Sequence, residues 1–259
     1  MKVLLLTDFS NYACEAHKYA FNLLQPQQAS YFLVHAETSQ QTENTNKIAS
    51  DLLISDKFDN AYQQLTNFLP KGNTLSRLER KGNLLDVVRT NIDLLEIDLV
   101  VMGAKGTSAT SDKSIGKNTY EIATKVKCPV LIVPENTKKN PPSRVNFPVD
   151  YKDKLHSKCI SKIQSLPNWA EMNITIHELN TAASGAFQQE SSQVLTENLK
   201  MVKPKFIQID EINFAKLTKE ADFIFLAAKN LGVCNTVFKQ LNYSVNGSVK
   251  PIPMLILHA

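Results

Sequence analysis

Apolar residues follow two alternating patterns along the first half of the chain. Short runs of consecutive apolar residues, typical of strands buried on both faces, alternate with segments in which apolar residues recur every three or four positions, as in helices. The pattern predicts strands at 3–6, 31–35, 74–79, 98–102 and 130–133, and helices at 12–23, 48–69, 83–95 (capped by Asn83) and 118–126. This alternation indicates an α/β protein with a parallel sheet covered by helices on both faces.

A linker is expected near the middle of the chain. Residues 135–144 read ENTKKNPPSR, a polar, charged segment with two adjacent prolines, and such a composition is typical of chain between domains. A length of 259 residues is also comfortable for two domains. We therefore predict a first domain at residues 1–137, a linker at 138–144 and a second domain at 145–259.

The second half repeats the first weakly. LLTDFSNYACEAHKYAFNLL lines up with NFPVDYKDKLHSKCISKIQSL, DLVVMGAKG with DFIFLAAKN, IGKNT with LGVCNT, and CPVLIVP with IPMLILH. The alignment places Asp150 opposite Asp8, Ala227 opposite Gly103, Asn230 opposite Gly106, and Gly232 opposite Gly116. Because these matches occur in the same order in both halves, they predict a tandem of two similar α/β domains.

Composition and charge exclude several classes of partner. The chain has 29 Lys and Arg against 25 Asp and Glu, a net charge of +4, which is too mild to indicate a nucleic-acid partner. No run approaches the roughly 18 apolar residues of a membrane span, and MKVLLLTDFS lacks the features of an export signal. The four scattered cysteines include no CxxC pair. We expect a cytoplasmic protein with no nucleic acid and no membrane among its partners.

Candidate chemistry follows the ends of two predicted strands. Asp8 follows the first strand, the segment 103–106 (GAKG) follows the fourth, and the segment 116–118 (GKN) opens the next helix. Parallel sheets bind ligands beyond the carboxyl ends of their strands. Glycines allow positive φ and close approach of a ligand to the main chain. A helix start favours an anion, and Lys105 and Lys117 add positive charge beside it. These features predict a phosphate site, in which Asp8 accepts hydrogen bonds from a ribose hydroxyl or a base.

The glycine spacing resembles that of the universal stress proteins. Nucleotide-binding members of that family carry Gly, two residues, Gly, nine residues, Gly and then Ser or Thr, after a strand of the type VVMG. Here VVMG ends at Gly103, Gly106 follows two residues later, and nine residues precede Gly116. The acid in TDFS, the strand ending LVH and the closing CPVLIVP are also similar to the family. The resemblance covers residues 1–134 well and the remainder more loosely.

The resemblance implies a sheet order of 3-2-1-4-5 in each domain and ATP or a related adenine nucleotide, with or without Mg²⁺, in the crevice of the first domain. Asp8 and the main chain near Val34 would hold the adenosine part, and main-chain groups of the glycine loop would contact the phosphates. The predicted site consists of Asp8, Val34, Met102, Gly103, Lys105, Gly106, Gly116, Lys117 and Asn118. The family's Ser or Thr after the third glycine is Lys117 here, so an ammonium replaces a hydroxyl that would contact phosphate.

The second domain looks like a degenerate copy. Ala227 and Asn230 replace two glycines, and only Leu231 separates Asn230 from Gly232, so the loop is too short to wrap a triphosphate. We therefore expect one nucleotide site per chain. The resemblance also implies that the two halves pack as an intrachain pseudo-dimer through the terminal strands at 130–133 and 254–257. A homodimer and a protein partner are left open.

Three other functions remain open beside a stress-linked, nucleotide-binding sensor or interaction module. The first is a scaffold that binds no nucleotide and acts through protein partners. The second is a weak ATPase, for which Asp8 is the one obvious acid and Asp112 a poor second. The third is a binder of a small molecule or lipid in the crevice of the second domain, which no motif supports.

Several residues also have simpler interpretations. Asp8 could merely cap the helix that follows it. Cys128 is expected in the core rather than as a nucleophile, and His35 is either structural or lines the crevice. One spacing invites a zinc site, because Cys and His stand three apart on the first helix and again on its counterpart, at Cys14, His17, His156 and Cys159. Zinc is disfavoured, since structural zinc ligands usually sit on tight loops.

Overall fold

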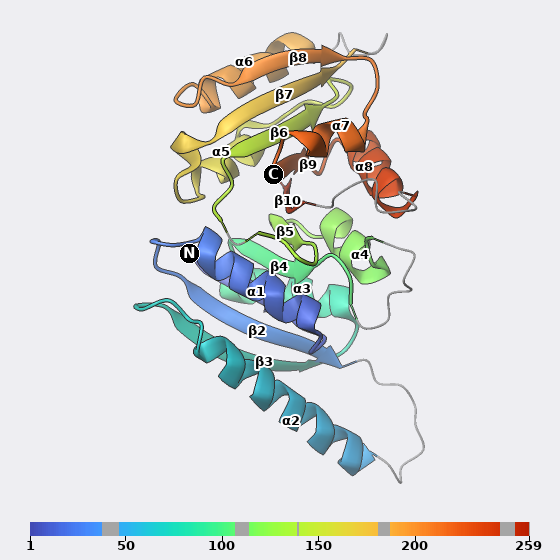
Figure 1. Ribbon diagram of the computed structural model, residues 1–259. Coiled ribbons are helices and arrows are strands. Elements are labelled where there is room, and N and C mark those ends of the chain that lie inside the picture. The colour runs from blue at the N-terminus through green and yellow to red at the C-terminus, as the bar shows by residue number, and fades with distance from the viewer. Residues whose placement is uncertain (38–46, 107–113, 139, 181–186, 244–251, 259) are drawn as a thin grey trace.

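The computed structural model describes residues 1–37, 47–106, 114–138, 140–180, 187–243 and 252–258 (Figure 1). The first half contains β1 (Lys2–Leu6), α1 (Asn11–Leu23), β2 (Ser30–Glu37), α2 (Lys47–Thr66), β3 (Thr74–Lys81), α3 (Leu84–Leu95), β4 (Leu99–Gly103), α4 (Lys117–Lys125) and β5 (Val130–Val133). All the strands and helices predicted for this half are confirmed. The largest difference is at the end of α2, which stops at Thr66 because the chain turns before Pro70.

The second half repeats this order of elements. It contains β6 (Arg144–Val149), α5 (Ser157–Gln164), a short 3-10 helix η1 (Trp169–Glu171), β7 (Asn173–Leu179), α6 (Gln188–Asn198), β8 (Lys205–Ile209), α7 (Phe214–Lys219), β9 (Phe223–Ala227), α8 (Leu231–Tyr243) and β10 (Met254–Leu257). None of the described helices is both long and apolar enough to cross a bilayer.

The strands form one continuous sheet in the order β3-β2-β1-β4-β5-β10-β9-β6-β7-β8. Each half therefore has the order 3-2-1-4-5 with parallel neighbours, as predicted. The halves meet where β5 and β10 pair antiparallel, with Leu131 opposite Leu255. This contact confirms the predicted pseudo-dimer through the terminal strands, and Figure 1 shows the two halves stacked along the sheet.

Two layers of helices cover the sheet because its strands are apolar on both faces. In β1, Val3 and Leu5 belong to one buried cluster, which α1, α2, α5 and α6 complete. Leu4 and Leu6 belong to a second cluster, which α3, α4, α7 and α8 complete. Because each cluster contains residues from both halves, the core is continuous across the β5–β10 junction.

Polar contacts also join α4 of the first half to the second half. The Tyr120 hydroxyl donates to Asn235 Oδ1 of α8 at 2.8 Å, and its ring lies edge-on to Phe238, 5.6 Å between centroids. His258 Nε2 lies 3.0 Å from the carbonyl oxygen of Ala123. Burial lowers the pKa of His258 to about 4, so the ring is neutral at pH 7. The helix that follows the glycine loop is thus held against the second domain.

Candidate functional site

The predicted site lies at the carboxyl ends of β1, β2 and β4. Because β1 lies between β2 and β4, the loops that follow β1 and β4 meet at this edge. Asp8, after β1, faces Gly106, after β4: a Cβ added to Gly106 would lie 2.5 Å from Asp8 Oδ2. A side chain at position 106 would displace the carboxylate, so glycine here keeps Asp8 in its place.

Hydrogen bonds orient the carboxylate of Asp8. Its Oδ1 accepts from the main-chain N–H of Ser10 at 3.1 Å and from the Ser10 hydroxyl at 2.5 Å. Ser10 is itself the N-cap of α1 and accepts from the N–H of Ala13. The interpretation of Asp8 as the cap of α1 is therefore wrong, since Ser10 caps the helix and Asp8 holds Ser10.

The three loop glycines provide space rather than unusual backbone angles. Among the described residues, the glycines with positive φ are Gly72 and Gly82, so the glycines of the site do not use the positive φ that glycine allows. At Gly103, an added Cβ would lie 3.0 Å from the carbonyl oxygen of Lys105 and 3.3 Å from the main chain of Tyr12. Gly103 therefore lets α1 pack closely against β4.

Gly116 differs from the other two because the described residues leave room for a side chain there. A Cβ on Gly116 would make only ordinary contacts, at 3.7 Å or more, and the residue has φ −72° and ψ 156°. Neither packing nor backbone geometry requires glycine at this position. A ligand that approaches the main chain would require it.

The start of α4 is electrostatically suited to an anion. Gly116 is the N-cap and provides no side-chain hydrogen bond, and the first turn contains no acidic residue. Instead the first turn carries Lys117, a cation at the positive end of the helix dipole, which is unfavourable unless an anion lies nearby. Lys117 and Asn118 are both exposed. Lys105 is half-buried, and its Nζ lies 3.9 Å from Glu135 Oε1, so part of its charge is already compensated.

The end of β2 forms the other side of the site. The side chain of Val34 is buried, and its carbonyl oxygen accepts from the N–H of Thr7 at 2.9 Å. His35 Nδ1 lies 2.9 Å from the carbonyl oxygen of Thr7, and its ring lies 4.3 Å from that of Phe9. Phe9 adopts φ 64°, a strained angle for a bulky residue. Sequence reasoning missed Phe9, for which its place inside the TDFS motif was the available signal.

Met102 plays a different part from the loop residues. Its side chain is buried in the apolar cluster beneath α3 and α4, so Met102 could contribute to a ligand site only through its main chain. Residues 107–113, among them Asp112, lie outside the described part of the chain. The last residue of the loop, Ile115, is buried, and its N–H donates to Asn242 Oδ1 of α8 at 2.8 Å. The second domain therefore anchors the end of the glycine loop.

The second half lacks the long loop that separates Gly106 from Gly116 in the first half. Asn230 follows β9 as Gly106 follows β4, and its carbonyl oxygen accepts from the N–H of Cys234, the bond that starts α8. Gly116 makes the same bond at the start of α4. Asn230 is thus equivalent to both Gly106 and Gly116, and the loop between those two glycines has no counterpart in the second half. The predicted pairing of Gly232 with Gly116 is wrong, since Gly232 lies within the first turn of α8.

Asn230 carries a buried side chain at the position where the first half has Gly106. It is 1% exposed, and its Oδ1 accepts from the N–H of Asp150 at 2.9 Å. Asp150 keeps the turn seen at Asp8, because its Oδ1 accepts from the N–H two residues later, at Lys152. Its Oδ2 lies 3.8 Å from Lys152 Nζ. The turn is repeated in the second half, and the glycine loop is not.

The cysteines and histidines give no sign of a metal site in the described ranges. No group of three or more His, Cys, Asp or Glu side chains is placed to hold an ion there. Burial raises the pKa values of the Cys128, Cys159 and Cys234 thiols to about 12, so these thiols are protonated at pH 7. Cys128 lies in the core as predicted, and its thiol donates to the carbonyl oxygen of Ile97.

The comparisons with known proteins agree with this architecture. The family model described as "Universal stress protein family" matches residues 1–134. No curated protein matches the chain. A universal stress protein from Archaeoglobus fulgidus superposes with a TM-score of 0.70 at 13% identity, covering 99% of this chain and 98% of that one.

Two further structures are similar at lower scores. A protein of unknown function from Pseudomonas aeruginosa, PA1789, superposes with a TM-score of 0.57 at 12% identity, covering 99% of this chain and 92% of that one. A universal stress protein in complex with cAMP covers 51% of this chain and 96% of its own, with 21% identity and a TM-score of 0.41. The family model matches more than half of the residues of this chain, so the chain belongs to the universal stress protein family.

Proposed function

We propose that the first half of the chain binds one adenine nucleotide, ATP or a close relative, and that the protein acts in the cytoplasm as a stress-linked sensor or interaction module. The observation that carries the proposal is that Asp8, Gly106 and the start of α4 at Gly116 lie together at the carboxyl ends of β1 and β4. Glycine at position 106 accommodates the carboxylate of Asp8, whereas neither the packing of the described residues nor the backbone angles require glycine at position 116.

The phosphates would lie at the start of α4. The first N–H groups of a helix have no partner within the helix, and Gly116 contributes no side chain to cap them. A phosphate there would accept from these groups and compensate the exposed charge of Lys117. Mg²⁺, where present, would be held mainly by phosphate oxygens and water. Among the acidic side chains of the described residues, Asp8 is the one that this proposal places closest to the Mg²⁺ ion.

The adenosine part would lie across the ends of β1 and β2. Asp8 would accept from a ribose hydroxyl or from the base, as the family resemblance implies, and the main chain next to Val34 would border the base. The aromatic pair of Phe9 and His35 lies at the same edge of the sheet. In the second half, the buried Asn230 replaces Gly106 and the glycine loop is missing, which supports a single site per chain.

Thermal unfolding of the full chain with and without ATP tests the proposal. A ligand that binds only the folded state raises the unfolding midpoint, and a concentration 100 times the Kd stabilises by about 2.7 kcal/mol. We expect ATP to raise the midpoint and GTP to raise it less. An unchanged midpoint at millimolar ATP would instead favour the scaffold that acts through protein partners. Phosphate release measured in Mg²⁺ separates a binder from a weak ATPase.

A further inference from the structure

The ten-stranded sheet ends in two edge strands, β3 and β8, and they differ in how they are protected. Edge strands present unpaired N–H and C=O groups that can pair with another chain, and proteins usually block them with charged side chains or cover. On β3, Arg77 forms ion pairs with Asp59 of α2 and with Glu79, and its guanidinium lies over the ring of Phe58. The edge at β3 is therefore charged and tied to the long helix α2.

The edge at β8 lacks this protection. The strand reads KFIQI, and its side chains after Lys205 are uncharged. Phe206, at 37% exposure, is one of the exposed large apolar residues of the protein. In the described part of the chain, no strand lies beyond β8. Figure 1 shows β8 as the outermost strand of the second half.

The backbone of β8 offers hydrogen bonds on its outer side. The carbonyl oxygen of Ile209 accepts from the N–H of Asn180, which continues β7, so Ile209 and Ile207 direct their main-chain groups inward. Because these directions alternate along a parallel strand, the N–H and C=O groups of Phe206 and Gln208 point outward. These are four groups for which the described chain provides no main-chain partner.

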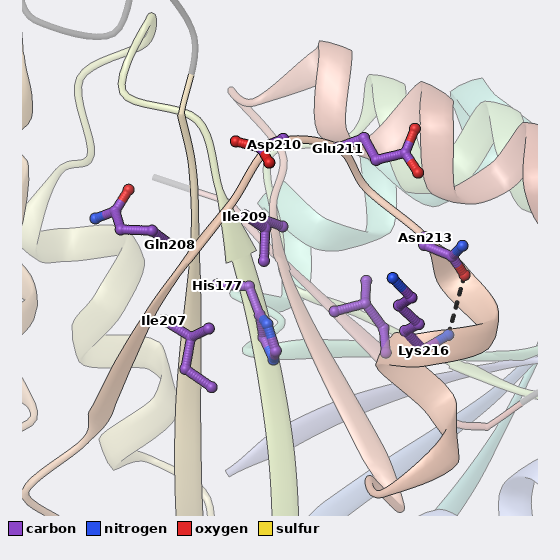
Figure 2. A pocket seen from close by; sticks show the side chains of 9 residues that line it. His177, Ile207, Gln208, Ile209, Asp210, Glu211, Asn213 and Lys216 are labelled. Carbon is purple, nitrogen blue, oxygen red and sulfur yellow. Dashed lines mark hydrogen bonds between the residues drawn. The ribbon is translucent and has the colours of Figure 1, made fainter.

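A pocket of about 500 Å³ adjoins this edge. Figure 2 shows Ile207 and Ile209 on β8 and His177 on β7, with Asp210 and Glu211 on the loop that leads into α7. The pocket does not lie at the crevice equivalent to the nucleotide site, where Asn230 is buried. In the first half, the twelve residues of α3 cover the corresponding face, whereas α7 has six. The shorter helix leaves the isoleucines of β8 half-exposed next to two carboxylates.

Charges around β8 are arranged in a self-complementary way. Lys203 and Lys205 precede the apolar centre of the strand, and Asp210 and Glu211 follow it. Within the described residues, none of these four side chains forms an ion pair. If two copies of β8 pair antiparallel about a two-fold axis at Ile207, Lys203 of one copy, which precedes the strand, comes near Glu211 of the other, which follows it. Lys205 then lies opposite Ile209, beside Asp210.

We propose that two copies of this chain associate through antiparallel pairing of β8 with the partner's β8, centred on Ile207. Phe206 and Gln208 form hydrogen-bonded pairs with the partner's Gln208 and Phe206, which makes four main-chain hydrogen bonds. Ile207 packs beside the partner's Ile207 on the pocket face of the sheet. The partner's Lys205 reaches the acidic rim of the pocket at Asp210. The sheets of the two copies thereby become one.

Sedimentation velocity on the full chain, from micromolar to near-millimolar concentration, tests this proposal. The mass is expected to rise from 29.0 kDa towards twice that value as concentration increases. Glu211→Lys places like charges opposite each other twice in the symmetric dimer and should weaken association about tenfold or more. The double variant Lys203→Glu with Glu211→Lys restores opposite charges and should recover most of that loss.

Two further variants separate this edge from other surfaces. Phe206→Pro removes an outward N–H that β7 does not use, so the monomer should fold normally, as circular dichroism would show, while the dimer is lost. Arg80→Glu on β3, at the opposite edge, should leave association unchanged. The proposal is overturned by a chain that stays monomeric throughout the range. It is equally overturned by a dimer that resists Glu211→Lys and Phe206→Pro, or by one that the β3 variant weakens.

Discussion

Gly116→Ala separates the needs of the fold from those of a ligand. The added Cβ would lie 3.7 Å from the carbonyl oxygen of Ala104 and from Thr119 Oγ1, and the φ and ψ of Gly116 suit any residue. The free energy of unfolding should therefore stay within about 0.5 kcal/mol of the wild type. Two effects offset each other here, because alanine restricts the unfolded chain whereas glycine is the better N-cap residue.

Nucleotide binding should respond very differently. A phosphate at the start of α4 would accept hydrogen bonds from main-chain N–H groups, and hydrogen bonds to charged groups contribute about 1.5–3 kcal/mol each. A methyl group at position 116 would occupy the space through which the phosphate reaches them. Losing one such bond corresponds to a Kd about 10-fold to 100-fold higher.

Isothermal titration of ATP into the variant and a matched control measures this difference. Gly232→Ala is the control, because an added Cβ there meets nothing within 4 Å and the residue lies at the start of α8 in the second half. Its affinity for ATP should equal that of the wild type. If Gly116→Ala also binds ATP with wild-type affinity, the phosphates do not approach the main chain at Gly116, and the reasoning about this loop fails.

Three further predictions concern the site and the core. Asp8→Asn should lower ATP affinity about tenfold with little loss of stability, because the amide oxygen can still accept from Ser10; equal affinity in a titration would contradict this. Asn242→Ala removes the acceptor of the Ile115 N–H and should speed hydrogen exchange at that amide and weaken ATP binding several-fold; unchanged exchange would show that the bond does not hold the loop. Burial lowers the pKa values of His17 and His258 to about 4 from 6.5, so the unfolded chain binds more protons between these values and stability falls as pH drops through this window. Urea unfolding should give about 2 kcal/mol less stability per histidine at pH 5 than at pH 7, whereas equal stability at both would contradict burial of the neutral rings.

The central strands β1, β4 and β5 were predictable because each is a short, nearly continuous apolar run that is buried on both faces of the sheet. β5 occupies the predicted residues, and β10 pairs with it as the internal repeat implied. The ends of helices were harder to predict from the sequence. Residues beyond Thr66 continue the apolar spacing of α2, but they lie in a turn. The local hydrogen-bonding potential of Asn83 was visible in the sequence, and its side chain does cap α3.

The site was predictable in position but not in its packing. The sequence pointed to the loop glycines as places of close approach to a ligand, whereas Gly106 accommodates Asp8, a contact between residues that are far apart in the sequence. The bond between Ile115 and Asn242 spans 127 positions, so no local pattern could indicate it. The sequence alignment placed Gly232 opposite Gly116, which is wrong because Asn230 both follows β9 and accepts the first hydrogen bond of α8.

Equilibrium binding of ATP to the full wild-type chain tests the central claim most directly, because it counts sites as well as measuring affinity. One ATP per chain, with binding lost or strongly weakened by Gly116→Ala, is the predicted result. The absence of measurable binding at millimolar ATP would contradict the proposed function. Two equivalent sites per chain would contradict the proposal that the second half, in which Asn230 replaces Gly106, binds no nucleotide.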